Sequence, residues 1–178
     1  MLYKGGNTYS LNSCETIEVF YNIRTDLDKL TCASYITKII NDVTTENQNT
    51  YRVLQLFLNT LYMISETDKN LDLIKSVFII RLLSIIGFRP IIDECKVCKT
   101  KENLTVFSFK DNGLKCVSCG KQDKGAIKIL ETTKDALRYI ILSSPKKIFS
   151  FDVPEETIKE LSIISKVYLS EKLEKEYK

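Results

Sequence analysis

DECKVCKTKENLTVFSFKDNGLKCVSCGK, residues 93–121, is the most informative segment of the chain. It holds two CxxC pairs, Cys95/Cys98 and Cys116/Cys119, with seventeen residues between them. Each pair forms a tight turn that directs two sulfurs towards one point, and this spacing is typical of a zinc ribbon. We therefore predict one structural zinc ion per chain, bound by these four cysteines.

The residues between the two pairs predict the hairpin that brings them together. A strand over 104–109 is followed by a turn at Asp111-Asn112-Gly113 and a return strand over 114–117. Four thiolates leave no open coordination position, so such a site is structural. The alternatives are an iron–sulfur cluster, a pair of redox CxxC motifs, or a ribbon without metal. Cys14 and Cys32 lie in periodic segments, and we expect them to be small buried residues.

The composition excludes several classes of enzyme. The chain of 178 residues contains no histidine, which removes Ser-His-Asp and Cys-His nucleophiles, HExxH metal sites and imidazole bases. No catalytic carboxylate pair and no glycine-rich phosphate loop is recognisable. We therefore predict that the protein is not an enzyme.

The chain shows no signal peptide, and its most apolar run, residues 77–88, is too short to span a bilayer and contains Arg81. We expect a cytoplasmic protein without a membrane partner. In a reducing compartment, paired CxxC motifs favour metal binding over disulfides.

Hydrophobic periodicity predicts a mainly α fold in which the zinc ribbon interrupts a helical domain. The N-terminal stretch alternates around Gly5-Gly6, which predicts a hairpin and two or three strands before Arg24. A helix over 51–65 would bury Leu54, Phe57, Leu61 and Ile64, and an apolar helix from Asn70 to Gly87 would be central. The charged C-terminal end, EKLEKEYK, should stay solvated. The predicted divisions are 1–23 (remnant strands of an OB-fold), 24–92 (first section of the helical domain), 93–124 (zinc ribbon) and 125–178 (second section of the helical domain).

Two groups of basic residues can be interpreted either as ordinary surface residues or as binding residues. Residues 89–128 hold nine Lys/Arg and five Asp/Glu, which fits either a solvated hairpin or a nucleic-acid contact. Lys75 and Arg81 project from the apolar helix, where they either pair locally or flank a groove for an acidic, apolar peptide. A local partner for Arg81 would be a carboxylate such as Asp72 or Glu66. The ribbon candidates for nucleic-acid contact are Lys96, Lys99, Lys115 and Lys121.

The order of these segments resembles the RecO family of bacterial recombination mediators. Four segments of the chain match features of that family. These are LYKGGNTYSLNSCETIEVF (closing strands of an N-terminal OB-fold), FIIRLLSIIGFRP (a helix ending in a Gly-aromatic-x-Pro turn), CKVC with FSFKDNGLKCVSC (the ribbon) and YLSEKLEKEYK (the C-terminal helix).

The resemblance implies a non-enzymatic role in DNA repair and recombination. RecO proteins bind single-stranded DNA and the acidic tail of the single-strand-binding protein, and they act with RecR to load RecA and anneal strands. Only the last strands of the OB-fold are recognisable, so we expect weak binding to single-stranded DNA. The helical domain is where the family docks the tail, which makes Lys75 and Arg81 the candidates for that contact.

Two other hypotheses compete with this one. The chain could be a zinc-ribbon scaffold module of the transcription or translation machinery, although such ribbons rarely interrupt a helical domain. It could also be a thiol oxidoreductase, but the closed cysteine set and the lack of histidine argue against that.

Overall fold

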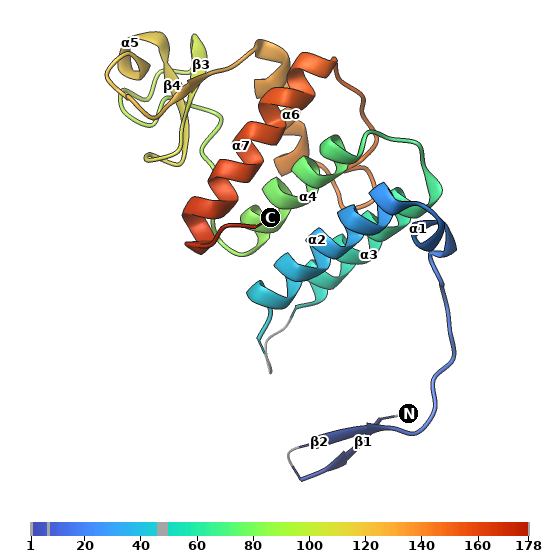
Figure 1. The fold of residues 1–178 in the computed structure, drawn as a ribbon. Coiled ribbons are helices and arrows are strands. Elements are labelled where there is room, and N and C mark those ends of the chain that lie inside the picture. Colours follow the sequence, from blue (N-terminus) through green and yellow to red (C-terminus); the bar gives the residue numbers. More distant parts are fainter. Residues whose placement is uncertain (1, 7, 46–49, 178) are drawn as a thin grey trace.

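The computed structural model describes residues 2–6, 8–45 and 50–177 and shows a mainly helical protein with a small β-ribbon at one end (Figure 1). The predicted mainly α class with an inserted four-cysteine cluster is confirmed. In chain order the elements are β1 Leu2–Gly5, β2 Thr8–Leu11, α1 Tyr21–Thr25, α2 Leu27–Val43, α3 Tyr51–Glu66, α4 Leu71–Ile85, β3 Leu104–Ser108, β4 Gly113–Cys116, α5 Val117–Gly120, β5 Ile127–Lys128, α6 Glu131–Leu142 and α7 Glu155–Leu173.

Helix α4 forms the centre of the helical body, as its apolar sequence predicts. Its first turn is capped by Asn70, whose side chain accepts hydrogen bonds from the backbone N–H groups of Asp72 and Leu73. Its C-terminus is followed by Gly87 at φ 102°, a conformation that favours glycine. Helices α3, α6 and α7 pack against it, so the segments before and after the ribbon share one core (Figure 1).

Helix α3 buries only part of the predicted face. Its buried residues are Val53, Leu56, Thr60, Ile64 and Ser65, whereas Leu54 is 51% exposed. The prediction is therefore wrong for Leu54 and confirmed for Ile64, and Phe57 and Leu61 are partly buried against the core. The periodicity selects an apolar side of the helix, but the packing against α4 decides which part of that side is buried most deeply.

The C-terminal segment is docked, which corrects the expectation that it stays solvated. Tyr177 is 5% exposed, and its ring packs edge-on against Tyr35 of α2. The Lys175 ammonium pairs with the Asp42 carboxylate at 2.7 Å. These contacts tie the end of the chain to α2, so the last described residues belong to the fold.

The N-terminal hairpin stands away from the helical body (Figure 1). Strands β1 and β2 pair antiparallel, with Gly5 opposite Thr8, as predicted. Residues 12–20 form no strand, so among the described residues this region has two strands. Cys14 is exposed, which corrects the expectation for it, and Cys32 is buried as expected.

Candidate metal centre and anion pocket

The four cysteines converge on one point at the end of the ribbon. Their sulfurs all lie within 4.8 Å of one another, and Cys98 Sγ is 3.7 Å from Cys116 Sγ. Cys95 and Cys116 are buried, whereas Cys98 is exposed. Four sulfurs at this separation could hold a metal ion in a closed tetrahedral shell.

Backbone contacts hold the two cysteine pairs in place. The Lys96 N–H donates to the Leu114 carbonyl at 3.0 Å, which fixes the first pair against β4. Gly113 lies so close to Ile91 that a Cβ would come within 2.3 Å of the Ile91 carbonyl oxygen. Gly120, directly after the second pair, faces Val106 with a similar lack of space, since a Cβ there would lie 2.6 Å from that side chain. Both glycines are therefore needed for close packing.

The thiols of the cluster differ in pKa. Burial disfavours the Cys95 thiolate, but hydrogen bonds from the backbone N–H groups of Cys98, Cys116 and Val97 outweigh it and lower the pKa of Cys95 to about 6. The pKa of Cys119 is raised to about 12, first because its thiol shares a hydrogen bond with Cys116 and second because of burial. Adjacent sulfurs thus hold protons that a divalent ion would replace.

Lys115 lies in the interior of the ribbon. Its side chain is 7% exposed and pairs with Asp111 and with Asp123, the latter at 2.7 Å. Ser108 donates a short hydrogen bond to Asp123 as well. The Lys115 ammonium and then the Ser108 hydroxyl lower the pKa of Asp123 to about 2. Because the Lys115 ammonium is buried between the carboxylates of Asp111 and Asp123, we withdraw Lys115 as a candidate for nucleic-acid contact.

The other ribbon lysines lie on the surface. Lys99 is 59% exposed and pairs with Glu94 at 2.8 Å. Lys96 and Lys121 are exposed, and neither forms an ion pair with another described residue. These three side chains remain available to a polyanion.

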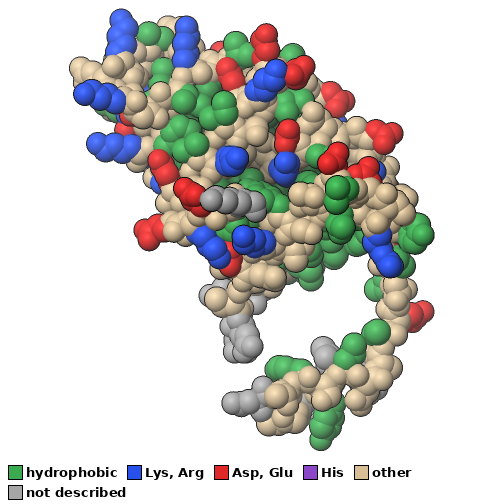
Figure 2. All heavy atoms as spheres, viewed as in Figure 1, with side chains coloured by type: hydrophobic (Ala, Val, Ile, Leu, Met, Phe, Trp, Pro, Cys, Tyr) green, Lys and Arg blue, Asp and Glu red, His purple; other side chains and the backbone are tan. Residues whose placement is uncertain are grey.

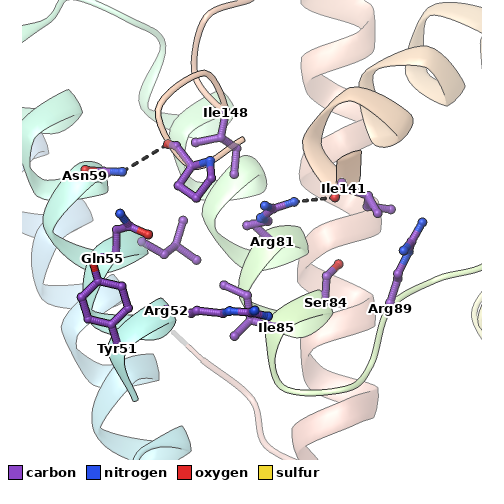
Figure 3. A pocket seen from close by; sticks show the side chains of 12 residues that line it. Tyr51, Arg52, Gln55, Asn59, Arg81, Ser84, Ile85, Arg89, Ile141 and Ile148 are labelled. Carbon is purple, nitrogen blue, oxygen red and sulfur yellow. Dashed lines mark hydrogen bonds between the residues drawn. The ribbon is translucent and has the colours of Figure 1, made fainter. Parts of the chain in front are cut away.

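A second site lies between α3, α4 and the loop that follows α6. It is a pocket of about 450 Å³ whose rim carries three guanidinium groups, from Arg52, Arg81 and Arg89 (Figure 3). None of the side chains lining the pocket is acidic. The remaining lining residues are Tyr51, Gln55, Leu56, Asn59, Ser84, Ile85, Ile141, Pro145 and Ile148.

Arg81 holds one wall of this pocket. Its guanidinium donates to the carbonyl oxygens of Ile140, Ile141 and Ser143 at the end of α6, with distances of 3.1 Å for Ile140 and 2.9 Å for Ser143. The local partners of Arg81 are therefore carbonyl groups, in place of the Asp72 or Glu66 carboxylate that we expected. Burial, followed by the charges of Arg89 and Arg52, lowers the pKa of Arg81.

Lys75 and Arg81 are not brought together. The Lys75 ammonium pairs with Asp72 at 2.7 Å, and Lys75 lines a different pocket that also contains Asp28 and Tyr177. Arg52 and Arg89 could not be recognised from the sequence pattern, because Arg52 lies at the start of α3 and Arg89 lies beyond the end of α4. The packing of α3 on α4 places Arg52 near Arg81, and the turn after α4 places Arg89 there.

The chain is therefore a mainly helical protein that is interrupted by a four-cysteine ribbon and carries an arginine-lined pocket on its helical body. The family model described as "Recombination protein O C terminal" matches residues 24–178, and the chain belongs to the RecO family of DNA repair proteins.

Individual relatives agree with this assignment. The chain is 47% identical to "DNA repair protein RecO" of Acetivibrio thermocellus over 99% of its own length and 71% of the relative. It is 31% identical to the protein of the same name from Thermoanaerobacter sp. over 100% of its length and 72% of the relative. Its family therefore acts in DNA repair and recombination. Within the stretch of chain that the structure describes, no helix is long and apolar enough to cross a membrane.

Proposed function

We propose that the protein is a non-enzymatic mediator of recombinational repair. It binds single-stranded DNA, the acidic tail of the single-strand-binding protein and RecR in the cytoplasm, and so helps RecA to load and strands to anneal. Family membership supports this role over a scaffold module of the transcription or translation machinery.

The observation that carries the proposal is the arginine-lined pocket without a carboxylate. An acidic peptide with an apolar end needs cations for its carboxylates and an apolar surface for its last side chain. Arg52 and Arg89 offer the cations. Neither forms an ion pair with another described residue. Leu56, Ile85 and Ile148 offer the apolar surface.

The proposed contacts differ from those expected from the sequence. Arg52 and Arg89 take the place of Lys75, which is already paired with Asp72 on another face. The Arg81 guanidinium bonds to carbonyl groups at the end of α6. Its contribution to tail binding is therefore to fix the position of the end of α6, which forms one side of the pocket.

The ribbon carries the second element of the proposal. We assign one zinc ion to the four cysteines, because an all-thiolate tetrahedral set is typical of structural zinc. Lys96, Lys99 and Lys121 would contact single-stranded DNA weakly, since three surface lysines supply few phosphate contacts. We also keep the division at residues 93–124 for the ribbon, with 1–23 as OB-fold strands.

Fluorescence anisotropy with a labelled acidic peptide that ends in an aromatic residue tests the tail proposal. We expect saturable binding that weakens moderately with salt, because the apolar contact persists when charges are screened. A peptide of the same composition in scrambled order, without the aromatic end, should bind more weakly. Equal binding of the two peptides would reduce the pocket to a non-specific anion site and would contradict the proposal.

A further inference from the structure

Of the three arginines that line the pocket, Arg89 alone lies outside a helix. It belongs to residues 86–92, which connect α4 to the ribbon and which we call the Arg89 linker (Figure 3). Pro90 follows it, and a proline fixes its own φ and restricts the residue before it to extended backbone. The position of Arg89 is therefore set by the attachments of a short, stiff linker.

The first attachment of the Arg89 linker is at Phe88. The Phe88 N–H donates to the Leu83 carbonyl at 2.7 Å, and the Phe88 carbonyl accepts a hydrogen bond from the Tyr168 hydroxyl of α7 at 3.1 Å. Tyr168 is 1% exposed, and its ring packs edge-on against Phe107 of β3, with the ring centroids 5.8 Å apart. A strand of the ribbon therefore supports the tyrosine that holds this attachment.

The second attachment is made by the ribbon itself. The Ile91 N–H donates to the Asn112 carbonyl at 2.9 Å, and the Ile91 carbonyl accepts from the Leu114 N–H at 2.7 Å. Ile91 thus lies directly beside Gly113, where a Cβ would come within 2.3 Å of the Ile91 carbonyl oxygen. Strand β4, which provides these contacts, ends at Cys116 of the four-cysteine cluster.

We infer that the ribbon positions Arg89 for the acidic tail, and that metal binding by the four cysteines therefore raises the affinity of the arginine-lined pocket for the tail. The inference rests on the proposed function of that pocket. Ribbons with strands as short as β3 and β4 depend on their metal for folding. Without metal, β4 no longer holds Ile91, and the linker keeps only its attachment at Phe88. An arginine that is not held in place binds an anion more weakly, because it must first be ordered.

The direction of the effect separates this positional coupling from a change in charge. Figure 2 shows Lys and Arg side chains along the outer edge of the ribbon (upper left), so the charge of the ribbon affects any acidic ligand. Four thiolates with a divalent ion carry a net charge of about −2, whereas most metal-free thiols hold protons at neutral pH. Charge alone therefore predicts tighter binding of an acidic peptide after metal removal. The position of Arg89 predicts weaker binding.

Anisotropy of the labelled tail peptide with zinc-loaded and chelator-treated protein tests the inference. We expect zinc removal to weaken binding to the wild type by about fivefold, a modest coupling between two sites. It should leave the affinity of Arg89→Ala unchanged. Arg52→Ala is the matched control and should keep the full effect of zinc, because Arg52 lies on α3. Equal effects of zinc in the two variants, or none in the wild type, would overturn the inference.

A pair of glycine variants tests the same coupling with zinc present. Gly113→Ala pushes Ile91 away from β4 and changes no cysteine. Gly120→Ala is the control, because its Cβ crowds Val106 inside the ribbon and lies away from the linker. At one zinc ion per chain, checked by elemental analysis, only Gly113→Ala should weaken peptide binding. Equal affinities of the two variants would contradict the inference.

A probe at position 89 distinguishes failure of the inference from failure of the proposed function. The chain contains no tryptophan, so Arg89→Trp places a single indole on the linker. Zinc removal should lower the fluorescence anisotropy of this indole and leave that of Ile163→Trp, on α7, unchanged. An indole at position 89 that does not respond overturns the inference, whether or not the peptide binds. A responsive indole in a protein that binds no peptide would refute the proposed function and leave the positioning of residue 89 by the ribbon in place.

Discussion

The guanidinium of Arg81 lies 2.9 Å from the carbonyl oxygen of Ser143, the residue directly after α6. This contact joins the central helix to the loop on the far side of the arginine-lined pocket. Asn59 supports the same loop from α3, since its side-chain amide donates to the Pro145 carbonyl at 3.2 Å. The pocket therefore has walls that are fixed by hydrogen bonds before any ligand arrives.

Replacing Arg81 by alanine should lower the free energy of unfolding by about 2 kcal/mol, because carbonyl groups at the end of α6 lose a charged donor. Arg81→Lys should recover some of the loss. Arg138→Ala is the matched control, because Arg138 makes a surface ion pair with Asp93 at 57% exposure and should cost at most about 1 kcal/mol. Urea unfolding measures all three. Equal losses of unfolding free energy in the two alanine variants would show that the Arg81 contacts stabilise the fold no more than a surface ion pair does.

Lys115→Met should destabilise the ribbon by about 2–4 kcal/mol, since Asp111 and Asp123 would lose the cation between them. Lys121→Met removes an exposed lysine nearby and should be close to neutral. Hydrogen exchange of the β3 and β4 amides reports the change locally. Unchanged exchange in Lys115→Met would mean that Lys115 is not a structural residue, and it would again be a candidate for DNA contact.

The ribbon should lose stability in acid through Asp123. Its pKa is held at about 2 in the folded protein, below its ordinary value, first by Lys115 and then by Ser108. A depressed carboxylate pKa stabilises the fold above the unfolded pKa, and this contribution disappears as the pH falls from about 4 towards about 2. Asp123→Asn should therefore be less stable at neutral pH and less sensitive to pH in that window. Thermal unfolding at several pH values tests this, and identical slopes for both proteins would refute it.

The purified protein should contain one zinc ion per chain, measured by elemental analysis. Cys116→Ser should abolish stoichiometric binding and unfold the ribbon, because structural zinc contributes on the order of 10 kcal/mol in small modules. Cys14→Ser is the control, as Cys14 is exposed and lies outside the cluster. Metal-free protein with four reactive thiols in the ribbon would rule out the zinc assignment.

The local sequence pattern predicted which residues form helices and strands better than it predicted which side of each helix is buried. The spacing of Cys95, Cys98, Cys116 and Cys119 predicted the cluster because each pair acts within four residues and one hairpin joins them. The buried face of α3 was predicted only in part: Ile64 is buried as expected, but the position of α4 buries Leu56 and leaves Leu54 exposed. The docking of Tyr177 on Tyr35 was also missed, since it joins residues at opposite ends of the helical domain.

The arginine-lined pocket was beyond prediction for the same reason. Arg52, Arg81 and Arg89 are spread over 38 positions of the chain and follow no common motif. Tertiary packing gathers them, and a single sequence without an alignment carries no signal of that packing. Arg81 alone was singled out, because a charge in an apolar helix is conspicuous.

Tail-peptide anisotropy with the charge-reversed pair Arg52→Glu and Arg89→Glu tests directly whether the pocket binds the tail. The control pair, Lys38→Glu and Lys121→Glu, makes the same change in net charge on exposed lysines outside the pocket. Charge reversal in the pocket should weaken binding by more than about tenfold, equivalent to about 1.4 kcal/mol. The control pair should weaken binding by no more than about threefold, through the general loss of positive charge. Equal affinities of the two folded double variants would contradict the assignment of the tail to this pocket.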